Sequence, residues 1–252
     1  MNREELLAYW MREEQQPFEG WDFAYLDGRM IEDETPWDYM ARAAALMDGS
    51  AIAIDLDTGG GERLLGLRPH WPPRLLTTEE YPPNLALARQ RLEPLGVQVI
   101  PVHLTDDDPM PFADGAFDLI LNRHAAFNPT EVARCLAPRG TFLTQQVHGL
   151  YAWDLIAAFD ARPEWPDATP AKYVPRLQAA GLTITDVQEW QGRLRFTDVG
   201  ALVYYLKAVP WTVPGFSVAT HQHYLFALQK RWEAEGELRF VAWKYLIETR
   251  KA

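Results

Sequence analysis

Residues 51–67, AIAIDLDTGGGERLLGL, decide the fold that this sequence predicts. The apolar run 51–56 is typical of a short strand, and residues 57–61 form a turn with three consecutive glycines. A helix is expected to begin at Glu62, with leucines available for burial. Strand, glycine turn and helix form the unit with which α/β proteins hold a nucleotide-like ligand at the carboxyl end of a central strand. Glycine lets the backbone approach a ligand closely, and a helix amino terminus offers free N–H groups.

Apolar runs of strand length recur along the chain and alternate with helical patterns. Besides the central strand, strands are expected at residues 74–78, 97–102, 117–122, 141–147, 182–190 and 240–248. Further helices are expected at residues 1–16, 38–47, 85–92, 131–136, 151–159, 171–180, 198–208 and 217–235. This alternation predicts an α/β fold with a doubly wound, mostly parallel seven-stranded sheet and right-handed crossovers. The aromatic-rich segment 18–39 is too apolar for a disordered tail and is expected to pack over another part of the protein.

The residues around the glycine turn argue against two classes of ligand site. A dinucleotide-binding fingerprint has the spacing G-x-G-x-x-G, and here Gly59 and Gly61 fit its first two positions but Leu64 occupies the third. A nicotinamide-dependent oxidoreductase is therefore disfavoured. A phosphate-binding P-loop places Gly-Lys-Ser/Thr after its glycines, whereas Glu62 and Arg63 follow here. The turn suits a nucleoside ligand with little or no phosphate.

Net charge and the amino terminus predict a cytoplasmic protein that acts apart from membranes and nucleic acids. The formal net charge is −11 at pH 7, and an acidic surface is unhelpful for binding nucleic acid or anionic lipid. The amino terminus is charged from its third residue and lacks an apolar signal core, and no apolar run reaches the roughly 18 residues of a membrane span. Cys135 is the only cysteine, so an intrachain disulfide is impossible, which fits a reducing cytoplasm. The oligomeric state stays open.

Four features of the sequence, in order, resemble the motifs of one family. DLDTGGGE, residues 55–62, resembles the first motif of the class I S-adenosylmethionine-dependent methyltransferases, an acid followed by a glycine-rich turn. Glu79 stands at the end of the second strand, where this family places the acid that binds the ribose hydroxyls. MPFADGAFDLIL, residues 110–121, and EVARCLAPRGTFLTQQV, residues 131–147, resemble the segments at the family's fourth and fifth strands. The resemblance covers about residues 37–147, and in bacterial methyltransferase-domain proteins of the small-molecule type it extends to WDFAYLDGR and DVGALVYYLKAVPW.

The resemblance implies a Rossmann-like sheet with an added helical cap. No internal repeat or linker divides the chain, so residues 1–252 are interpreted as a single methyltransferase domain. Within it, residues 1–47 are expected to form an N-terminal helical and aromatic cap and residues 48–150 the cofactor-binding core. Residues 151–252 are expected to complete the sheet and to form a substrate cap.

The implied cofactor is S-adenosylmethionine, held by acids and glycines at the strand ends. Asp55 and Glu79 can accept hydrogen bonds from its hydroxyls or amino group, and Asp106, or its neighbour Asp107, from the adenine amino group. The structural alternatives are a helix cap or a solvated strand end for the first two acids, and a solvated acidic loop for the last two. The full set expected to bind the cofactor is Asp55, Asp57, Gly59, Gly61, Glu79, Asp106 and Asn122.

The candidate catalytic residues follow the fourth strand. Methyl transfer is an in-line displacement on a sulfonium, in which the protein mainly aligns the nucleophile and excludes water. His124 is the candidate base, with a hydrogen-bonded structural histidine as the alternative, and Arg123 can hold an acidic substrate or the methionine carboxylate. No metal site is expected, because His221 and His223 are two apart on an expected helix and point to different sides. A lid over the site, or ordinary packing on the sheet, is expected of Trp21, Phe23, Tyr25, Trp37, Tyr204, Tyr205 and Trp211.

Asp57 departs from the family pattern, because it replaces the first glycine of the usual turn. Aspartate tolerates unusual backbone angles, but it is larger than glycine and carries charge near the cofactor's carboxylate. The sequence thus predicts methyl transfer to a small molecule, with the acceptor unnamed because specificity lies in the cap. Two alternatives stay open. One is an S-adenosylmethionine-binding protein with weak or lost catalysis, which Asp57 favours. The other is an RNA or protein methyltransferase, and the acidic net charge disfavours the RNA substrate.

Overall fold

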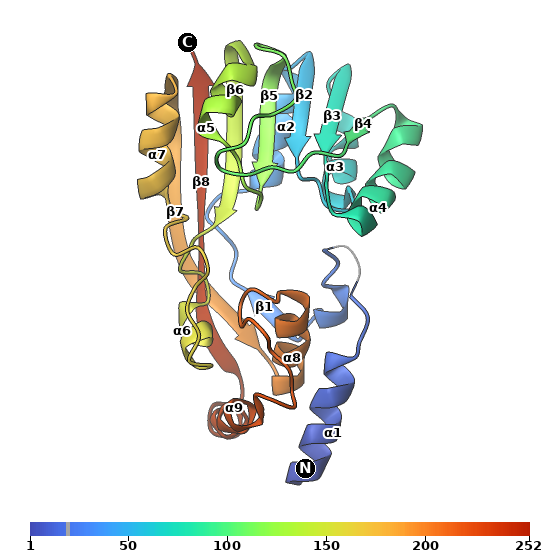
Figure 1. The fold of residues 1–252 in the computed structure, drawn as a ribbon, viewed down its shortest axis with the longest axis vertical. Helices are drawn as coiled ribbons and strands as arrows, with labels where there is room; N and C mark the ends of the chain where they lie inside the picture. The colour runs from blue at the N-terminus through green and yellow to red at the C-terminus, as the bar shows by residue number, and fades with distance from the viewer. Residues whose placement is uncertain (19–20) are drawn as a thin grey trace.

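The computed structural model describes residues 1–18 and 21–252. Glu19 and Gly20, part of the aromatic segment expected to pack over the protein, lie outside the described residues. Figure 1 shows two regions: a sheet flanked by helices, and below it a lobe of helices joined to the sheet by a long two-stranded ribbon. Among the described residues, no helix is long and apolar enough to cross a membrane.

One sheet forms the centre of the molecule. Its strands are β1 (Met30–Glu32), β2 (Ile52–Leu56), β3 (Arg74–Thr78), β4 (Gln98–Ile100), β5 (Phe117–Arg123), β6 (Leu136–Val147), β7 (Leu182–Phe196) and β8 (Leu238–Lys251). The order is β1-β7-β8-β6-β5-β2-β3-β4. The strands from β4 to β6 in this order pair in parallel, whereas β8 is antiparallel to both β6 and β7.

The predicted fold class is confirmed, with one strand more than expected. All seven predicted strands are present, and β1 is the eighth. It pairs antiparallel with the end of β7, from Met30 opposite Phe196 to Glu32 opposite Leu194. Residues 30–32 carry no local strand signal, because a three-residue strand is stabilised by its neighbour and not by its own pattern.

Helices cover both faces of the sheet and build the lobe. The α-helices are α1 (Arg3–Glu14), α2 (Tyr39–Asp48), α3 (Glu62–Gly66), α4 (Pro82–Leu92), α5 (Pro129–Cys135), α6 (Trp153–Ala157), α7 (Pro170–Ala179), α8 (Val199–Ala208) and α9 (Gln222–Glu235). Short 3-10 helices are η1 (Ala24–Leu26), η2 (Arg68–His70) and η3 (Glu93–Leu95). Buried residues of α2, α3 and α4 pack on one face of the sheet, and those of α5 and α7 on the other.

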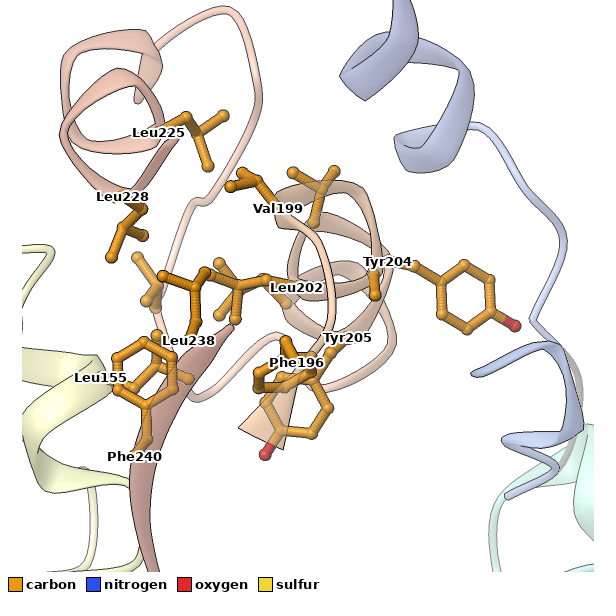
Figure 2. Packing of buried hydrophobic residues seen from close by; sticks show 14 of the residues in the cluster. Leu155, Phe196, Val199, Leu202, Tyr204, Tyr205, Leu225, Leu228, Leu238 and Phe240 are labelled. Atoms are coloured by element: carbon orange, nitrogen blue, oxygen red, sulfur yellow. The ribbon is translucent and has the colours of Figure 1, made fainter. Parts of the chain in front are cut away.

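The ribbon of β7 and β8 is longer than the sequence predicted. Its register runs from Leu182 opposite Lys251 to Phe196 opposite Leu238, well past the ends of the parallel strands. Its far end enters the hydrophobic core of the lobe, where Leu202 of α8 packs with Leu225 of α9 and Phe240 of β8 (Figure 2). Helix α8 is buried nearly all round, as expected for a helix that is apolar on every side.

A partly buried polar network ties the N-terminal helix into the lobe. The Arg29 guanidinium forms ion pairs with Glu13 of α1, at 3.1 Å, and with Asp198, the N-cap of α8, at 2.9 Å. Tyr9 of α1 donates a hydrogen bond to the same Asp198 carboxylate at 2.9 Å. The lobe is therefore assembled from both ends of the chain, whereas α2, within the predicted N-terminal cap, packs on the sheet through Met47.

Candidate functional site

The carboxyl ends of β2, β3, β5 and β6 lie at the edge of the sheet that faces the lobe (Figure 1). In an open α/β sheet, ligands bind beyond this edge, where connections leave to opposite faces. Here β2 leads into α3 on one face, and β5 leads into α5 on the other. The predicted cofactor and catalytic residues follow these strands, so the site is built from this edge.

The glycine turn needs backbone angles that favour glycine. Gly59 has φ 65° and Gly61 has φ 83°, both in the left-handed region. A Cβ at Gly61 would lie 2.8 Å from the Leu92 side chain of α4, so even an alanine would force that side chain to shift. The turn is also anchored to β3, because Thr58 N–H donates to the Thr78 carbonyl at 2.9 Å.

Asp57, which stands in place of the family's first glycine, adopts the left-handed backbone conformation that glycine favours. Its φ is 54°, and aspartate is one of the few side chains found at such angles. Its own N–H donates to Thr78 Oγ1 at 2.9 Å, which holds it in place. Burial, followed by the charges of Glu79 and Glu80, raises the pKa of Asp57 to about 7. At neutral pH the carboxyl is therefore about half protonated, and its charge is weaker than the sequence implied.

The two acids predicted to bind the cofactor lie beside this turn. Burial raises the pKa of Asp55 to about 7. Glu79 is 5% exposed and accepts a hydrogen bond from Tyr81 N–H at 2.8 Å; burial raises its pKa as well. Carboxyls with raised pKa values in a recess are frequent at functional sites. The structure thus brings Asp55, Asp57, Gly59, Gly61 and Glu79 together.

A small cavity extends from the turn to the end of β5. It has a volume of about 50 Å³, and its lining includes Tyr39, Asp55, Asp57, Arg63 and Arg123. The sequence analysis missed Arg63, since a charged residue one turn into a helix usually faces solvent. In the folded chain Arg63 lines the same cavity as Arg123, 60 residues further along the sequence.

Within the part of the chain that the structure describes, Arg123 at the end of β5 has no carboxylate partner. No carboxylate of the described residues lies within 4.0 Å of its guanidinium or of the neighbouring Arg63. Burial and the Arg63 charge lower the pKa of Arg123. Two adjacent guanidinium groups that share no ion pair form a site suited to an anion.

His124 follows Arg123, directly after β5 at the edge of the sheet that faces the lobe. Its φ is 62°, an uncommon backbone angle for a histidine, and its side chain is exposed. Its Nε2 lies 3.2 Å from Nε2 of Gln145 on β6, whose Oε1 accepts a hydrogen bond from Trp37 Nε1 at 2.7 Å. Loss of hydration around the ring, followed by the charges of Arg123, Lys244 and Arg63, lowers the pKa of His124 well below its usual value.

Two of the predicted cofactor residues are engaged elsewhere in the structure. Asn122 is fully buried within the sheet, where its Oδ1 accepts a hydrogen bond from Thr144 at 2.7 Å. Its Nδ2 is buried and has no partner among the described residues. The Asp106 carboxylate accepts from Tyr173 of α7 at 3.0 Å and pairs with Lys172 at 2.8 Å. Asp106 is thus held against α7 and not beside the glycine turn, and cofactor contacts by both residues stay predictions.

Trp21 lies next to the turn, and it begins a row of three indoles from different parts of the chain. Trp21 Cδ1 is 3.1 Å from the place that a Cβ at Gly59 would take. The Trp21 ring is 5.7 Å from Trp211, which is 6.3 Å from Trp165, a residue that the sequence analysis did not single out. All three indoles are more than a third exposed. Of the other predicted lid residues, Tyr204 and Tyr205 belong to the lobe core.

Comparisons with known proteins identify the fold. No family model matches the sequence, and no curated protein does. Among solved structures, the YcgJ protein from Bacillus subtilis is 15% identical with a TM-score of 0.59, covering 84% of this chain and 97% of that one. An S-adenosylmethionine-dependent methyltransferase from Mesorhizobium loti is 16% identical with a TM-score of 0.50 (83% and 96% covered). The [4+2]-cyclase SpnF is 15% identical with a TM-score of 0.50 (99% and 92% covered).

Proposed function

We propose that this chain, which has the fold of the class I S-adenosylmethionine-dependent methyltransferases, transfers the methyl group of that cofactor to a small-molecule acceptor. The observation that carries the proposal is the glycine turn after β2. It combines left-handed backbone at Asp57, Gly59 and Gly61 with the buried carboxyls of Asp55 and Glu79.

The residues at the turn fit the cofactor. Gly59 and Gly61 adopt the left-handed backbone of the turn without strain, and Thr58 Oγ1 is buried without a hydrogen-bond partner among the described residues. A buried hydroxyl without a partner is costly, and a ligand that bonds to it removes that cost. Asp55 and Glu79 would accept hydrogen bonds from hydroxyl or amino groups. Bound S-adenosylmethionine would supply a methyl group already activated on a sulfonium.

The acceptor would lie beyond the end of β5. His124 is exposed there, and Arg123 lines the cavity that leads to the turn. These two residues are proposed to contact the acceptor and to hold it in line with the methyl group, which is the main contribution a protein makes to such a displacement. A net charge of −11 favours a small molecule over a nucleic acid.

A second candidate is a protein that binds the cofactor and performs a different reaction or none. Asp57, which places a partly charged side chain in the turn, favours this candidate. So does the similarity to SpnF, a [4+2]-cyclase that covers 99% of this chain. Methyl transfer and cofactor binding therefore need separate tests.

The first test is calorimetric titration with S-adenosylhomocysteine, the demethylated form of the cofactor. We expect binding by the intact chain and a loss of at least tenfold in affinity for Glu79→Gln. The matched control is Glu93→Gln, a half-exposed carboxylate paired only with Arg89 on the surface, which should leave the affinity unchanged. Equal effects of the two variants, or no binding by the intact chain, would refute the cofactor site. Release of labelled methyl product then distinguishes the enzyme from the second candidate.

A further inference from the structure

Trp37, Gln145 and His124 form a chain of hydrogen bonds whose direction is fixed. Gln145 lies on β6, His124 follows β5, and Trp37 precedes α2. An indole N–H can only donate, so the oxygen of the Gln145 amide must face Trp37, at 2.7 Å. The amide nitrogen of Gln145 then faces His124 Nε2, at 3.2 Å. Since an amide nitrogen also only donates, His124 Nε2 must accept. Trp37 and Gln145 are both nearly fully buried, so water cannot readily replace either partner.

This arrangement determines the tautomer of His124. When Nε2 accepts, the neutral ring carries its proton on Nδ1. Nδ1 makes no hydrogen bond with the described residues, and the ring is exposed, so this N–H is available to a ligand. The nearby charges of Arg123, Lys244 and Arg63 oppose a second proton on the ring. His124 therefore has a donor to offer and no free lone pair with which to act as a base.

The charges around His124 favour an anionic acceptor. Arg63 and Arg123 share no ion pair with the described carboxylates, and they flank the cavity that leads to the turn. Lys244 is less available, because it is paired with Glu32 of β1. Two guanidinium groups and a neutral N–H donor suit a carboxylate, which accepts hydrogen bonds and needs no base to become nucleophilic.

We propose that the acceptor is a small carboxylic acid, methylated on oxygen, and that Trp37 and Gln145 act as positioning residues that keep His124 a hydrogen-bond donor to it. The inference rests on the proposed methyl transfer. In the step, a carboxylate oxygen forms a bond to the methyl carbon while the carbon–sulfur bond breaks and its electron pair stays on sulfur. The products are a methyl ester and S-adenosylhomocysteine, and no proton is gained or lost.

The tautomer can be tested without an acceptor. In 15N-histidine-labelled protein, nitrogen chemical shifts distinguish a protonated from an unprotonated ring nitrogen. We expect the proton of His124 on Nδ1 throughout pH 6–8. His148 is an internal control of the opposite kind, because its Nδ1 accepts from Leu150 N–H at 3.0 Å and its proton must lie on Nε2. In Gln145→Glu, a carboxylate faces His124, and the proton should move to Nε2. A proton on Nε2 in the unmodified protein, or titration near pH 6.5, would overturn the inference.

The acceptor class is tested with matched pairs of probes. Benzoate, phenylacetate and octanoate are each incubated with the intact protein and labelled S-adenosylmethionine, beside the alcohol of the same skeleton. We expect methyl ester from at least one acid and no ether from any alcohol, with kcat/KM lowered at least tenfold in Gln145→Glu. Transfer to alcohols only would overturn the carboxylate inference. Binding of S-adenosylhomocysteine without transfer to any probe would count against both the carboxylate acceptor and the proposed transfer, whereas the tautomer result is decided independently.

Discussion

Replacing Asp57 tests whether the unusual residue of the glycine turn weakens the cofactor site. Asp57→Asn removes the charge and keeps the size, and Asp57→Gly removes both and also relieves the left-handed backbone at φ 54°. The two variants together separate the electrostatic effect from the conformational one. We expect both to bind S-adenosylhomocysteine more tightly than the unmodified protein, and Asp57→Gly to bind it most tightly.

The magnitude follows from the pKa of Asp57. Burial first, and then Glu79 and Glu80, raise it from 3.8 to about 7, which corresponds to about 4 kcal/mol between the two protonation states. Since the Asp57 side chain keeps some contact with solvent, we expect removal of its charge to raise the free energy of unfolding by about 2 kcal/mol. The left-handed backbone adds about 1 kcal/mol, which only Asp57→Gly recovers.

The pKa of Asp57 also determines how its contribution to the free energy of unfolding changes with pH. The folded-state pKa of Asp57 lies above the unfolded value, so the folded protein binds this proton more tightly. Its contribution to stability is fully present below about pH 4 and is lost as the pH rises through about 7. The gain in the free energy of unfolding on Asp57→Asn should therefore grow from pH 5 to pH 8 and level off above.

The same reasoning applies to binding. At pH 8.5 the Asp57 carboxylate is charged and would repel the carboxylate of bound S-adenosylhomocysteine, by on the order of 1–2 kcal/mol at an effective dielectric constant of about 20. We expect Asp57→Asn to tighten binding of S-adenosylhomocysteine at least tenfold at pH 8.5, and by less than threefold at pH 6. Calorimetric titration at both pH values measures this. Equal or weaker binding by both variants at pH 8.5 would refute the reasoning.

Three further predictions concern the turn, the aromatic residues and the lobe. Gly61→Ala should lower stability and abolish S-adenosylhomocysteine binding, because its Cβ would meet a leucine of α4 at 2.8 Å. The control Gly236→Ala has nearly the same φ but nothing within 4 Å of its Cβ, so it should cost only about 1 kcal/mol of stability. Equal losses of stability in urea unfolding would contradict this prediction. Trp21→Ala should weaken S-adenosylhomocysteine binding about tenfold without lowering the unfolding midpoint, since the ring is 48% exposed and touches Gly59; unchanged affinity would show that it does not line the site. Leu202→Ala should lower the free energy of unfolding by about 2–5 kcal/mol, because the side chain is fully buried in the lobe core; a loss below 1 kcal/mol would mean that the lobe contributes little to cooperative folding.

The parallel part of the sheet could be predicted because its signals are local. The runs at residues 51–56 and 74–78 each end at an acid, and the run at 117–122 has an apolar centre; strands β2, β3 and β5 lie within one residue of these predicted bounds. The far half of the β7–β8 ribbon and strand β1 depend on pairing across more than forty residues, from Leu194 to Phe240 and to Glu32. No short stretch of sequence contains that information.

The site was predictable only where it lies on the strand ends themselves. Asp55, Asp57 and Glu79 lie together because parallel strands bring their carboxyl ends to one edge. Asp106 lies on a long loop, and its direction is set by Tyr173 and its neighbours in α7, which the sequence could not place against it. The hydrogen bond of Trp37 to Gln145, 108 residues away, likewise exists only in the folded chain.

A crystal structure of the protein with S-adenosylhomocysteine tests the central claim most directly. We expect the ligand at the carboxyl end of β2, next to the protein backbone at Gly59 and Gly61. Its hydroxyl groups should be hydrogen-bonded to Glu79, and its sulfur should be directed toward His124. Density for the ligand elsewhere, for example in the apolar groove of about 540 Å³ lined by Trp153 and Trp243, would contradict the account. So would crystals grown with saturating ligand in which the turn and the Asp55 and Glu79 carboxyls contact only water.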